Sequence, residues 1–111
     1  GEVVPLAEKI KDSRFKIPHM GWNELTIPAQ QERHFVLRSA ETSAQKPEHY
    51  YFVHSFVFEC KDTHNILAQV DYGGIFCAAI GRDNILGVQF HPEKSQEAGL
   101  KLLRDFLLWT P

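Results

Sequence analysis

The sequence predicts an α/β domain, made mostly of an antiparallel β meander followed by a C-terminal amphipathic helix. Three strand-length apolar runs, 66–72, 75–81 and 84–90, follow one another with only two residues between neighbours. Linkers this short join antiparallel strands, because parallel strands need a long crossover. After residue 95 the spacing of apolar residues changes from strand-like to helical. The length allows one domain, which we take as residues 1–111.

The N-terminal third of the chain has the least regular pattern. Residues 2–6, EVVPL, are predicted to form a strand that Pro5 confines to an edge or an end, because proline lacks the backbone N–H of a ladder. Residues 16–25, KIPHMGWNEL, fit neither an alternating nor a helical period. We expect this segment to be non-repetitive, with large apolar groups that fill a core or line a pocket.

The middle of the chain has the pattern of strands around a loop. Residues 35–38, FVLR, are predicted to form a short strand, and the polar stretch 39–49 a surface loop. Residues 50–60, YYFVHSFVFEC, carry aromatic and β-branched side chains at most positions. This composition predicts one strand that is covered on both faces.

Two short linkers join the three strands of the meander. Gly73-Gly74 separates the first two strands, and Arg82-Asp83 separates the next two. Tight hairpin turns need positive φ, which glycine adopts freely and aspartate tolerates. Both linkers therefore fit hairpins.

The last segment, roughly 95–108, has the pattern of an amphipathic helix that packs on the sheet. Ser95 is placed to cap its N-terminus, and Gln96 and Glu97 occupy the first turn, where an acid suits the helix dipole. One face is predicted to be buried and the other to face solvent. The apolar face holds Gly99, Leu102, Leu103, Phe106 and Leu107, and the polar face holds Lys101, Arg104 and Asp105.

The composition argues against several kinds of partner. The 12 basic and 14 acidic side chains are interleaved and give a formal net charge of −2, so nothing directs the chain to nucleic acid or to an anionic membrane. No apolar run approaches the roughly 18 residues that cross a bilayer, and the first residues have no signal-peptide character. Cys60 and Cys77 form no CxxC pair, which favours reduced thiols in a cytoplasmic protein.

The stretch GVQFHPEKS, residues 87–95, places two titratable side chains at the end of a predicted strand. His91 can exchange protons near neutral pH, and Glu93 would fix its tautomer, as the carboxylate does in a nucleophile–base–acid triad. A simple turn, with a hydrogen-bonded histidine and a solvated glutamate before a helix, explains the same residues. The spacing alone leaves both interpretations open.

The other histidines give weaker indications. His54 lies inside a predicted strand and is typical of a satisfied core histidine, while Ser55 and Phe56 beside it can present backbone groups to a ligand. The remaining histidines form no HxH, HxxH or HExxH pair, so no metal site is predicted.

Neither cysteine has the setting of a nucleophile. Lys61 would modestly favour a thiolate at Cys60, whereas the apolar run around Cys77 would raise the pKa of its thiol. Catalytic cysteines usually sit on a sharp, glycine-flanked turn at a helix N-terminus, and neither of these does. The residues thus supply a base and an orienting acid but no nucleophile.

GVQFHPEKS resembles the C-terminal catalytic motif of the class I, triad-type glutamine amidotransferases. IPHMGWN and YYFVHSF narrow the resemblance to the glutaminase subunits of imidazole glycerol phosphate synthase, and it extends over nearly the whole chain. Members of that family have a three-layer α/β fold, with the nucleophilic cysteine in a G-x-C-x-G elbow of the N-terminal half. The resemblance therefore implies that residues 1–111 form the C-terminal part of such a domain, and that its nucleophile lies outside them.

The same resemblance implies a role for individual residues. His91 would be the general base and Glu93 the residue that orients it, while the backbone of Ser55 and Phe56 would bind the α-amino and carboxylate groups of glutamine. No metal or organic cofactor is implied. The positions that match the face toward the synthase partner are Met20, Trp22, Asn23, Tyr51 and Lys94.

The family's reaction hydrolyses glutamine through a γ-glutamyl thioester. The ammonia passes to a (β/α)₈-barrel synthase, a separate subunit or a fused domain, which makes imidazole glycerol phosphate and AICAR in histidine biosynthesis. Two other functions stay open: a glutaminase that feeds another acceptor, for instance in surface-sugar biosynthesis, and a non-catalytic, partner-binding fragment. We expect the isolated chain to be inactive, because it lacks a nucleophile and an oxyanion hole, and to self-associate through an uncovered sheet edge.

Overall fold

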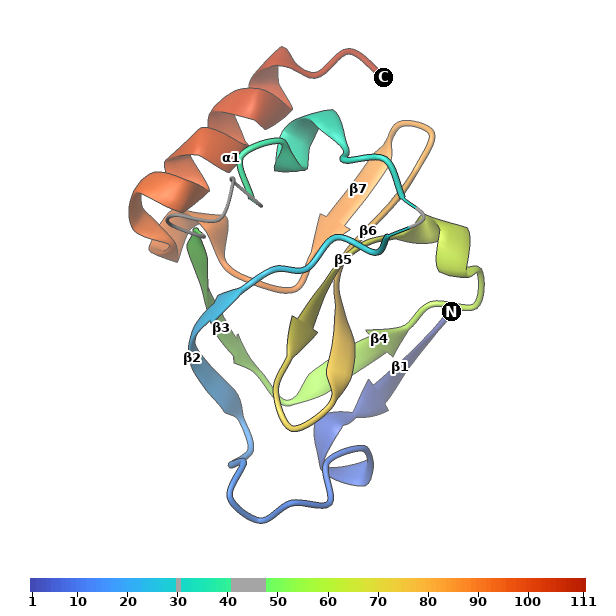
Figure 1. Ribbon diagram of the computed structural model, residues 1–111, viewed down its shortest axis with the longest axis vertical. Helices are drawn as coiled ribbons and strands as arrows, with labels where there is room; N and C mark the ends of the chain where they lie inside the picture. Colours follow the sequence, from blue (N-terminus) through green and yellow to red (C-terminus); the bar gives the residue numbers. More distant parts are fainter. Residues whose placement is uncertain (30, 41–47) are drawn as a thin grey trace.

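The computed structural model describes residues 1–29, 31–40 and 48–111, which form antiparallel strands and a C-terminal α-helix (Figure 1). The strands are β1 (Glu2–Pro5), β2 (His19–Glu24), β3 (His49–His54), β4 (Phe56–Glu59), β5 (Ile66–Asp71), β6 (Ile75–Arg82) and β7 (Ile85–Val88), and the helix is α1 (Gln96–Leu108). Short 3₁₀ helices lie at η1 (Leu6–Glu8), η2 (Phe35–Leu37), η3 (Thr63–Asn65) and η4 (Pro92–Lys94).

The strands pair in three small antiparallel sheets: β1 with β4, β2 with β3, and β5 with β6 and β7. The predicted meander is confirmed, with Asp71 opposite Ile75 across the first turn and Arg82 opposite Ile85 across the second. The turns also use the expected backbone, since φ is 68° at Gly73 and 54° at Asp83. The strand predicted within residues 2–6 is present as β1, which pairs with β4 in a sheet that has two strands within the described residues, so β1 lies at an edge.

The prediction of one strand over 50–60 is wrong, because the strand breaks at Ser55. β3 before the break pairs with β2, and β4 after it pairs with β1 in another sheet. The carbonyl of Ser55 accepts a hydrogen bond from the Leu6 amide (2.9 Å), which carries the β1–β4 register one pair past Phe56. The segment is also not covered on both faces, since Phe56 is 54% exposed.

The prediction of a non-repetitive segment over 16–25 is wrong as well, because His19–Glu24 is a regular strand paired along its whole length with β3. Its side chains do alternate, but with inverted polarity. His19 points inward and is buried, whereas Met20 and Trp22 point outward and are 60% and 47% exposed. A polarity pattern that assumes apolar residues inside misses such a strand.

Residues 35–38 do not form the predicted strand. Phe35–Leu37 is the 3₁₀ turn η2, which His34 caps through its Nδ1, an acceptor for the amide of Val36 (3.1 Å). The turn buries the consecutive side chains of Val36 and Leu37, which a strand would send to opposite faces. Part of the predicted loop over 39–49, residues 41–47, lies outside the described residues.

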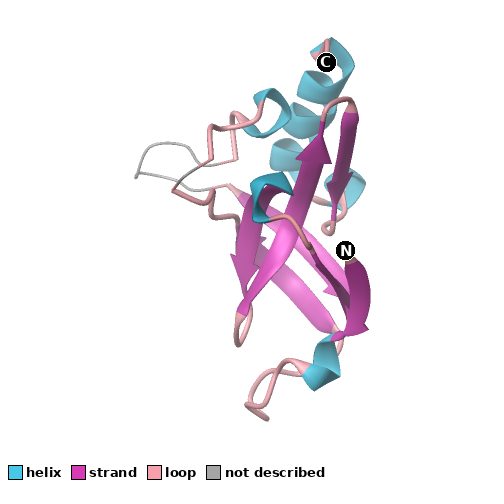
Figure 2. Ribbon diagram, turned by 90° about the vertical axis from the view of Figure 1, so that its right-hand side faces the viewer, coloured by secondary structure: helices cyan, strands magenta, loops and turns pink. Residues whose placement is uncertain are grey.

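The helix predicted near 95–108 is confirmed, but its buried face differs from the prediction. Asp105 is fully buried and accepts a hydrogen bond from Arg38 Nη2 (2.7 Å), because α1 packs on η2 (Figure 2). Leu103, Phe106 and Leu107 are 38%, 48% and 83% exposed. Arg38, whose hydrogen bond allows Asp105 to be buried, lies 67 residues earlier in the chain.

The main core lies where η2, β3, β5, β6 and α1 meet, and it positions the end of β7. Its larger members are Leu25, Val36, Leu37, Tyr50, Phe52, Leu67, Val70, Phe90 and Leu102. A smaller cluster under β1 and η1 is formed by Leu6, Ile10 and Val57. The main core holds β3 and the segment after β7 side by side, and the candidate site is built on these two.

Candidate functional site

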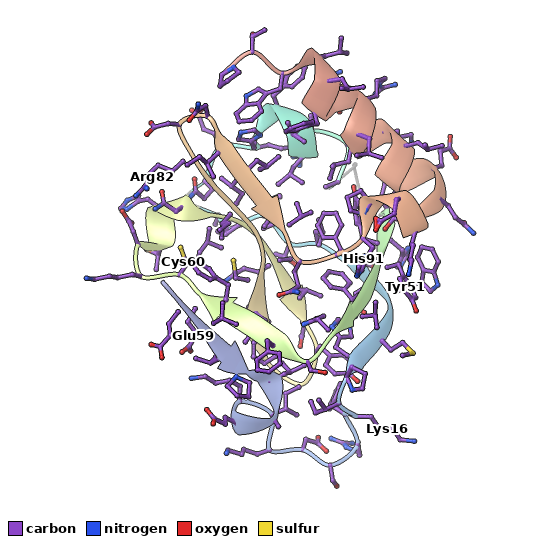
Figure 3. All side chains as sticks on the ribbon, turned by 180° about the vertical axis from the view of Figure 1, so that it is seen from behind. Lys16, Tyr51, Glu59, Cys60, Arg82 and His91 are labelled. Atoms are coloured by element: carbon purple, nitrogen blue, oxygen red, sulfur yellow. The ribbon has the colours of Figure 1, made fainter. Side chains whose placement is uncertain are left out.

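The His91 turn is fixed to β3 by backbone hydrogen bonds. After β7 the chain crosses to β3, where the His91 amide donates to the carbonyl of Tyr51 (2.9 Å; Figure 3). Pro92 then starts the short turn η4, since its fixed φ suits a first helical position. His91 therefore stands at a point where two elements, distant in sequence, are locked together.

Ser95 strengthens this junction and is 1% exposed. Its hydroxyl donates to the carbonyl of His91 (2.6 Å) and accepts from the amide of Tyr51 (2.9 Å). Ser95 occupies the predicted N-cap position of α1, but its side chain makes no capping hydrogen bond. The hydroxyl is used to tie the His91 turn to β3 instead.

Gly99 allows α1 to approach the same turn closely. A Cβ at this position would overlap the carbonyl oxygen of Pro92. Only glycine permits this contact, because the obstructing atom belongs to the backbone and cannot rotate away. The turn that carries His91 is thus braced by β3 on one side and by α1 on the other.

The pairing of His91 with Glu93, predicted from the sequence, is present. His91 Nδ1 lies 2.9 Å from Glu93 Oε1, so the imidazole donates from Nδ1 and keeps a lone pair on Nε2. Nε2 makes no hydrogen bond to any described residue, and the His91 side chain is 37% exposed. The hydrogen bond from His91 lowers the pKa of Glu93. The pair is arranged to accept a proton from outside.

A second histidine cluster lies behind the first, on β2 and β3. His19 Nδ1 is 2.8 Å from His54 Nε2, His19 Nε2 is 2.7 Å from Asn23 Oδ1, and His54 Nδ1 is 2.9 Å from the carbonyl of Phe56. Both nitrogens of His54 are bonded, as expected of a satisfied histidine. Burial lowers the pKa of both His19 and His54, and the proximity of His91 lowers that of His54 further.

Ser55 and Phe56, the predicted contacts for glutamine, form the corner between β3 and β4, which we call the Ser55–Phe56 corner. Both carbonyls are engaged within the chain, Ser55 with the amide of Leu6 and Phe56 with His54 Nδ1. The corner follows directly on His54, which is hydrogen-bonded to Phe56 through Nδ1. The structure thus ties the predicted substrate-binding backbone to His54.

Of the five residues predicted to face a partner, Met20, Trp22 and Lys94 are exposed and Tyr51 is half-buried. Trp22 stands opposite Tyr51 in the β2–β3 ladder with their ring centroids 5.4 Å apart, and Met20 points to the same side of β2. Lys94 is exposed on η4. Asn23 is separated from them, because strand alternation turns it to the inner face toward His19.

The two cysteines lie away from His91. Cys60 Sγ donates to the carbonyl of Asp62 (3.2 Å), and burial raises the pKa of Cys77 to about 11, as the sequence predicted in direction. Both are free thiols. Neither is hydrogen-bonded to His91 within the described part of the chain, so the structure brings no thiol to the base.

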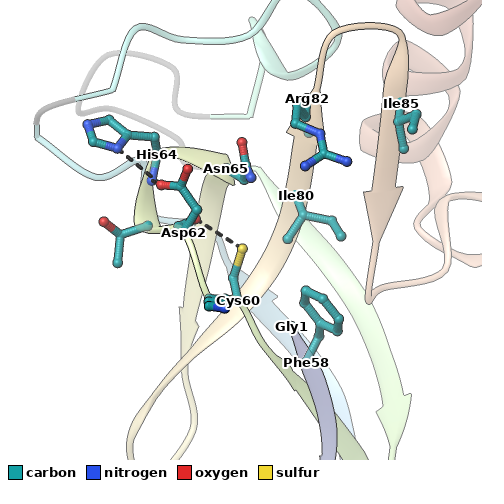
Figure 4. A pocket seen from close by; sticks show the side chains of 12 residues that line it. Gly1, Phe58, Cys60, Asp62, His64, Asn65, Ile80, Arg82 and Ile85 are labelled. Atoms are coloured by element: carbon teal, nitrogen blue, oxygen red, sulfur yellow. Dashed lines mark hydrogen bonds and ion pairs between the residues drawn. The ribbon is translucent and has the colours of Figure 1, made fainter.

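An open cavity of about 710 Å³ lies beside Cys60, between η3 and the β6–β7 hairpin (Figure 4). Its wall includes Phe58, Lys61, Asp62 and Arg82, none of which the sequence indicated as a site. Figure 3 shows Cys60 and Arg82 on the opposite side of the molecule from His91. The cavity is therefore separate from the candidate site.

Two further features bear on the site. Residues 1–29, 31–40 and 48–111 bring no three His, Cys, Asp or Glu side chains together as metal ligands would be. In the same described ranges, no helix is both long and apolar enough to span a membrane.

Comparison with known proteins links the site to one family. Residues 3–109 match the family model described as glutamine amidotransferase class-I. The chain is 50% identical over 109 residues to the imidazole glycerol phosphate synthase subunit HisH of Azospirillum brasilense, covering 98% of this chain and 52% of the relative. It is 47% identical to the HisH subunit of Cereibacter sphaeroides and 45% identical to that of Zymomonas mobilis, covering all of this chain and 48% and 46% of those relatives. The chain thus spans about half the length of the curated relatives it matches.

Proposed function

The chain belongs to the class-I glutamine amidotransferases, and from this premise we propose that it is the C-terminal part of a glutaminase subunit of imidazole glycerol phosphate synthase. The complete subunit, meaning this chain joined to an N-terminal half that carries the nucleophile, hydrolyses glutamine. Its ammonia serves a barrel-shaped synthase partner that makes imidazole glycerol phosphate and AICAR.

The observation that carries this proposal is the state of His91. Glu93 occupies Nδ1 and leaves a lone pair on Nε2, which no described residue engages. A histidine held in this way is suited to general base catalysis, because the carboxylate also stabilises the imidazolium that forms. An ordinary turn explains the hydrogen bond, but it does not require the bracing of the turn by Ser95 and Gly99.

In this mechanism His91 Nε2 takes the proton of a cysteine thiol from the N-terminal half as the sulfur attacks the glutamine amide carbon. The same proton passes to the amide nitrogen, which leaves as ammonia, and a thioester remains. Water then attacks the thioester, with Nε2 again as the base, and glutamate is released. The Ser55–Phe56 corner binds the α-amino and carboxylate groups of glutamine.

The proposed contact for the synthase partner is formed by the exposed Met20, Trp22 and Lys94 with the half-buried Tyr51. Its aromatic and methionine side chains are of the kinds enriched in protein interfaces. Tyr51 also holds the His91 amide, so contact at this face reaches the base through one residue. Docking of the partner there would therefore affect the position of His91.

A chimera tests the proposal. The first half of the Azospirillum brasilense relative is joined to this chain at the boundary of the match, and glutamate release is measured with and without the synthase partner of that relative. We expect the chimera to release glutamate and the 111-residue chain alone to release none. A folded chimera that binds the partner but does not hydrolyse glutamine would contradict the proposal.

A further inference from the structure

The hydrogen bonds of His54 determine where its proton lies. The carbonyl of Phe56 can only accept, so the bond of 2.9 Å to it requires a proton on His54 Nδ1. In the neutral ring, Nε2 is then an acceptor. It must receive its bond of 2.8 Å from a proton on His19 Nδ1. The tautomer of His54 is thus coupled to that of His19.

Asn23 completes the chain of hydrogen bonds at the far side of His19. A neutral His19 with its proton on Nδ1 offers a lone pair at Nε2. The Asn23 amide atom that lies 2.7 Å from Nε2 as Oδ1 must then be the donating nitrogen, with the amide turned over. The amide does so when its nitrogen faces the ring, and this orientation gives up only the long bond of 3.5 Å to the carbonyl of Asp71. With the amide oxygen toward the ring, the two imidazoles must hold one extra proton.

The surroundings favour the neutral form. His19 is 1% exposed, and its ring is stacked on Tyr72 at 3.9 Å and on Phe52 at 4.9 Å. The titratable groups that face the pair are Tyr72, on the β5–β6 turn, and His91, on the turn after β7. Burial lowers the pKa of both histidines, and the proximity of His91 further opposes a charge on His54. In the neutral and the protonated forms alike, His54 Nδ1 donates to Phe56.

From this geometry we propose that Asn23, His19 and His54 form a hydrogen-bond relay that keeps the proton of His54 on Nδ1 and thereby positions the Ser55–Phe56 corner for glutamine. The three are positioning residues, since they act through the backbone of the corner. The relay deepens the proposed function and rests on it for the identity of the ligand.

The corner needs such a support because it joins two different sheets. β3 ends at His54 and pairs with β2, whereas β4 begins at Phe56 and pairs with β1. The bond from His54 Nδ1 to the Phe56 carbonyl crosses the corner, whereas the bond from the Leu6 amide to Ser55 continues the β1–β4 register up to it. Loss of the bond between His54 and Phe56 leaves the direction of the Phe56 peptide less well defined. We expect this to weaken substrate binding more than the chemical step.

Two variants of His54 separate this role from simple packing. Both variants replace the imidazole with an amide. In His54→Asn the amide nitrogen can take the place of Nδ1 and donate to Phe56, whereas in His54→Gln it reaches only the place of Nε2. In the complete subunit with its synthase partner, we expect His54→Gln to raise KM for glutamine about tenfold, the loss of one hydrogen bond, and to change kcat less. His54→Asn should keep KM within about twofold. Equal KM values for the two variants would overturn the proposal.

A second readout does not depend on glutaminase activity. In the complete subunit labelled with ¹⁵N at histidine, side-chain NMR distinguishes a proton on Nδ1 from a proton on Nε2. We expect His54 in the Nδ1–H form at neutral pH, and the Nε2–H form would overturn the relay. If the labelled subunit shows Nδ1–H but hydrolyses no glutamine, the relay stands and the proposed function fails.

Discussion

Two histidines of this chain make the same local hydrogen bond but have different proposed roles. His91 donates from Nδ1 to the carboxylate of Glu93, and His54 donates from Nδ1 to the carbonyl of Phe56, each two residues further along. The difference lies at Nε2. That of His91 has no bonded partner in the described ranges, whereas that of His54 is held by His19.

The contrast shows that, when Nδ1 is bonded, the partner of Nε2 determines what a histidine can do. With one nitrogen bonded and the other accessible, the ring is oriented and can still accept a proton. When both nitrogens are bonded inside the protein, the ring holds its bonded neighbours in place and has no lone pair left to accept a proton from a reactant. Changes at the accessible histidine, at its supporting contacts and at the enclosed pair should therefore differ in size.

The largest effect is expected for His91→Asn in the complete subunit. Removal of the base should lower kcat for glutamine hydrolysis by about a thousandfold or more, with KM nearly unchanged. His64→Asn is the matched control, since His64 is also paired with an acid two residues away, Asp62, at 3.1 Å. Steady-state kinetics should show near-normal turnover for the control. Comparable turnover in both variants would contradict the role of His91.

Gly99→Ala should be the most damaging change to the support of the His91 turn. The added Cβ overlaps the Pro92 carbonyl, so α1 and the turn must separate, at a cost of about 3 kcal/mol of unfolding free energy. Leu100→Ala, next to it and 67% exposed, should change stability by less than about 1 kcal/mol. Urea unfolding compares the two, and equal losses would argue against the close contact.

Ser95→Ala should cost somewhat less, about 2 kcal/mol, because it leaves the amide of Tyr51 without its hydrogen-bond acceptor. The variant also frees the His91 carbonyl, so turnover should fall together with stability. Ser13→Ala removes an exposed hydroxyl and serves as the control. Normal stability of Ser95→Ala would mean that the hydroxyl does not hold the junction.

The smallest effect is expected from pH. Burial lowers the pKa of His19 and His54, so the unfolded chain binds more protons than the folded chain below pH 6.5, the ordinary pKa of histidine. Stability should therefore be complete above this pH and should decrease as the pH falls below it. Urea midpoints between pH 7.5 and 5.5 check the direction, and His54→Asn should reduce the dependence. A midpoint that rises on acidification would contradict the enclosed, neutral pair.

The sequence predicted those parts of the molecule that depend on local pattern. The meander has regular apolar runs and short turns, and the pairing of His91 with Glu93 needs only a turn of the right length. The parts that were missed depend on distant partners. Polar His19 is buried because His54, 35 residues later, bonds to it, and Asp105 is buried because Arg38, 67 residues earlier, does so. Local periodicity contains neither relation.

We propose that His91 serves a nucleophile that lies outside residues 1–111. Its most direct test is the intact mass of the chain after incubation with an electrophilic glutamine analogue, in parallel with the complete subunit. We expect no added mass on the chain, and one adduct on the complete subunit that maps to a cysteine outside these residues. A stoichiometric adduct on Cys60 or Cys77 would contradict the claim.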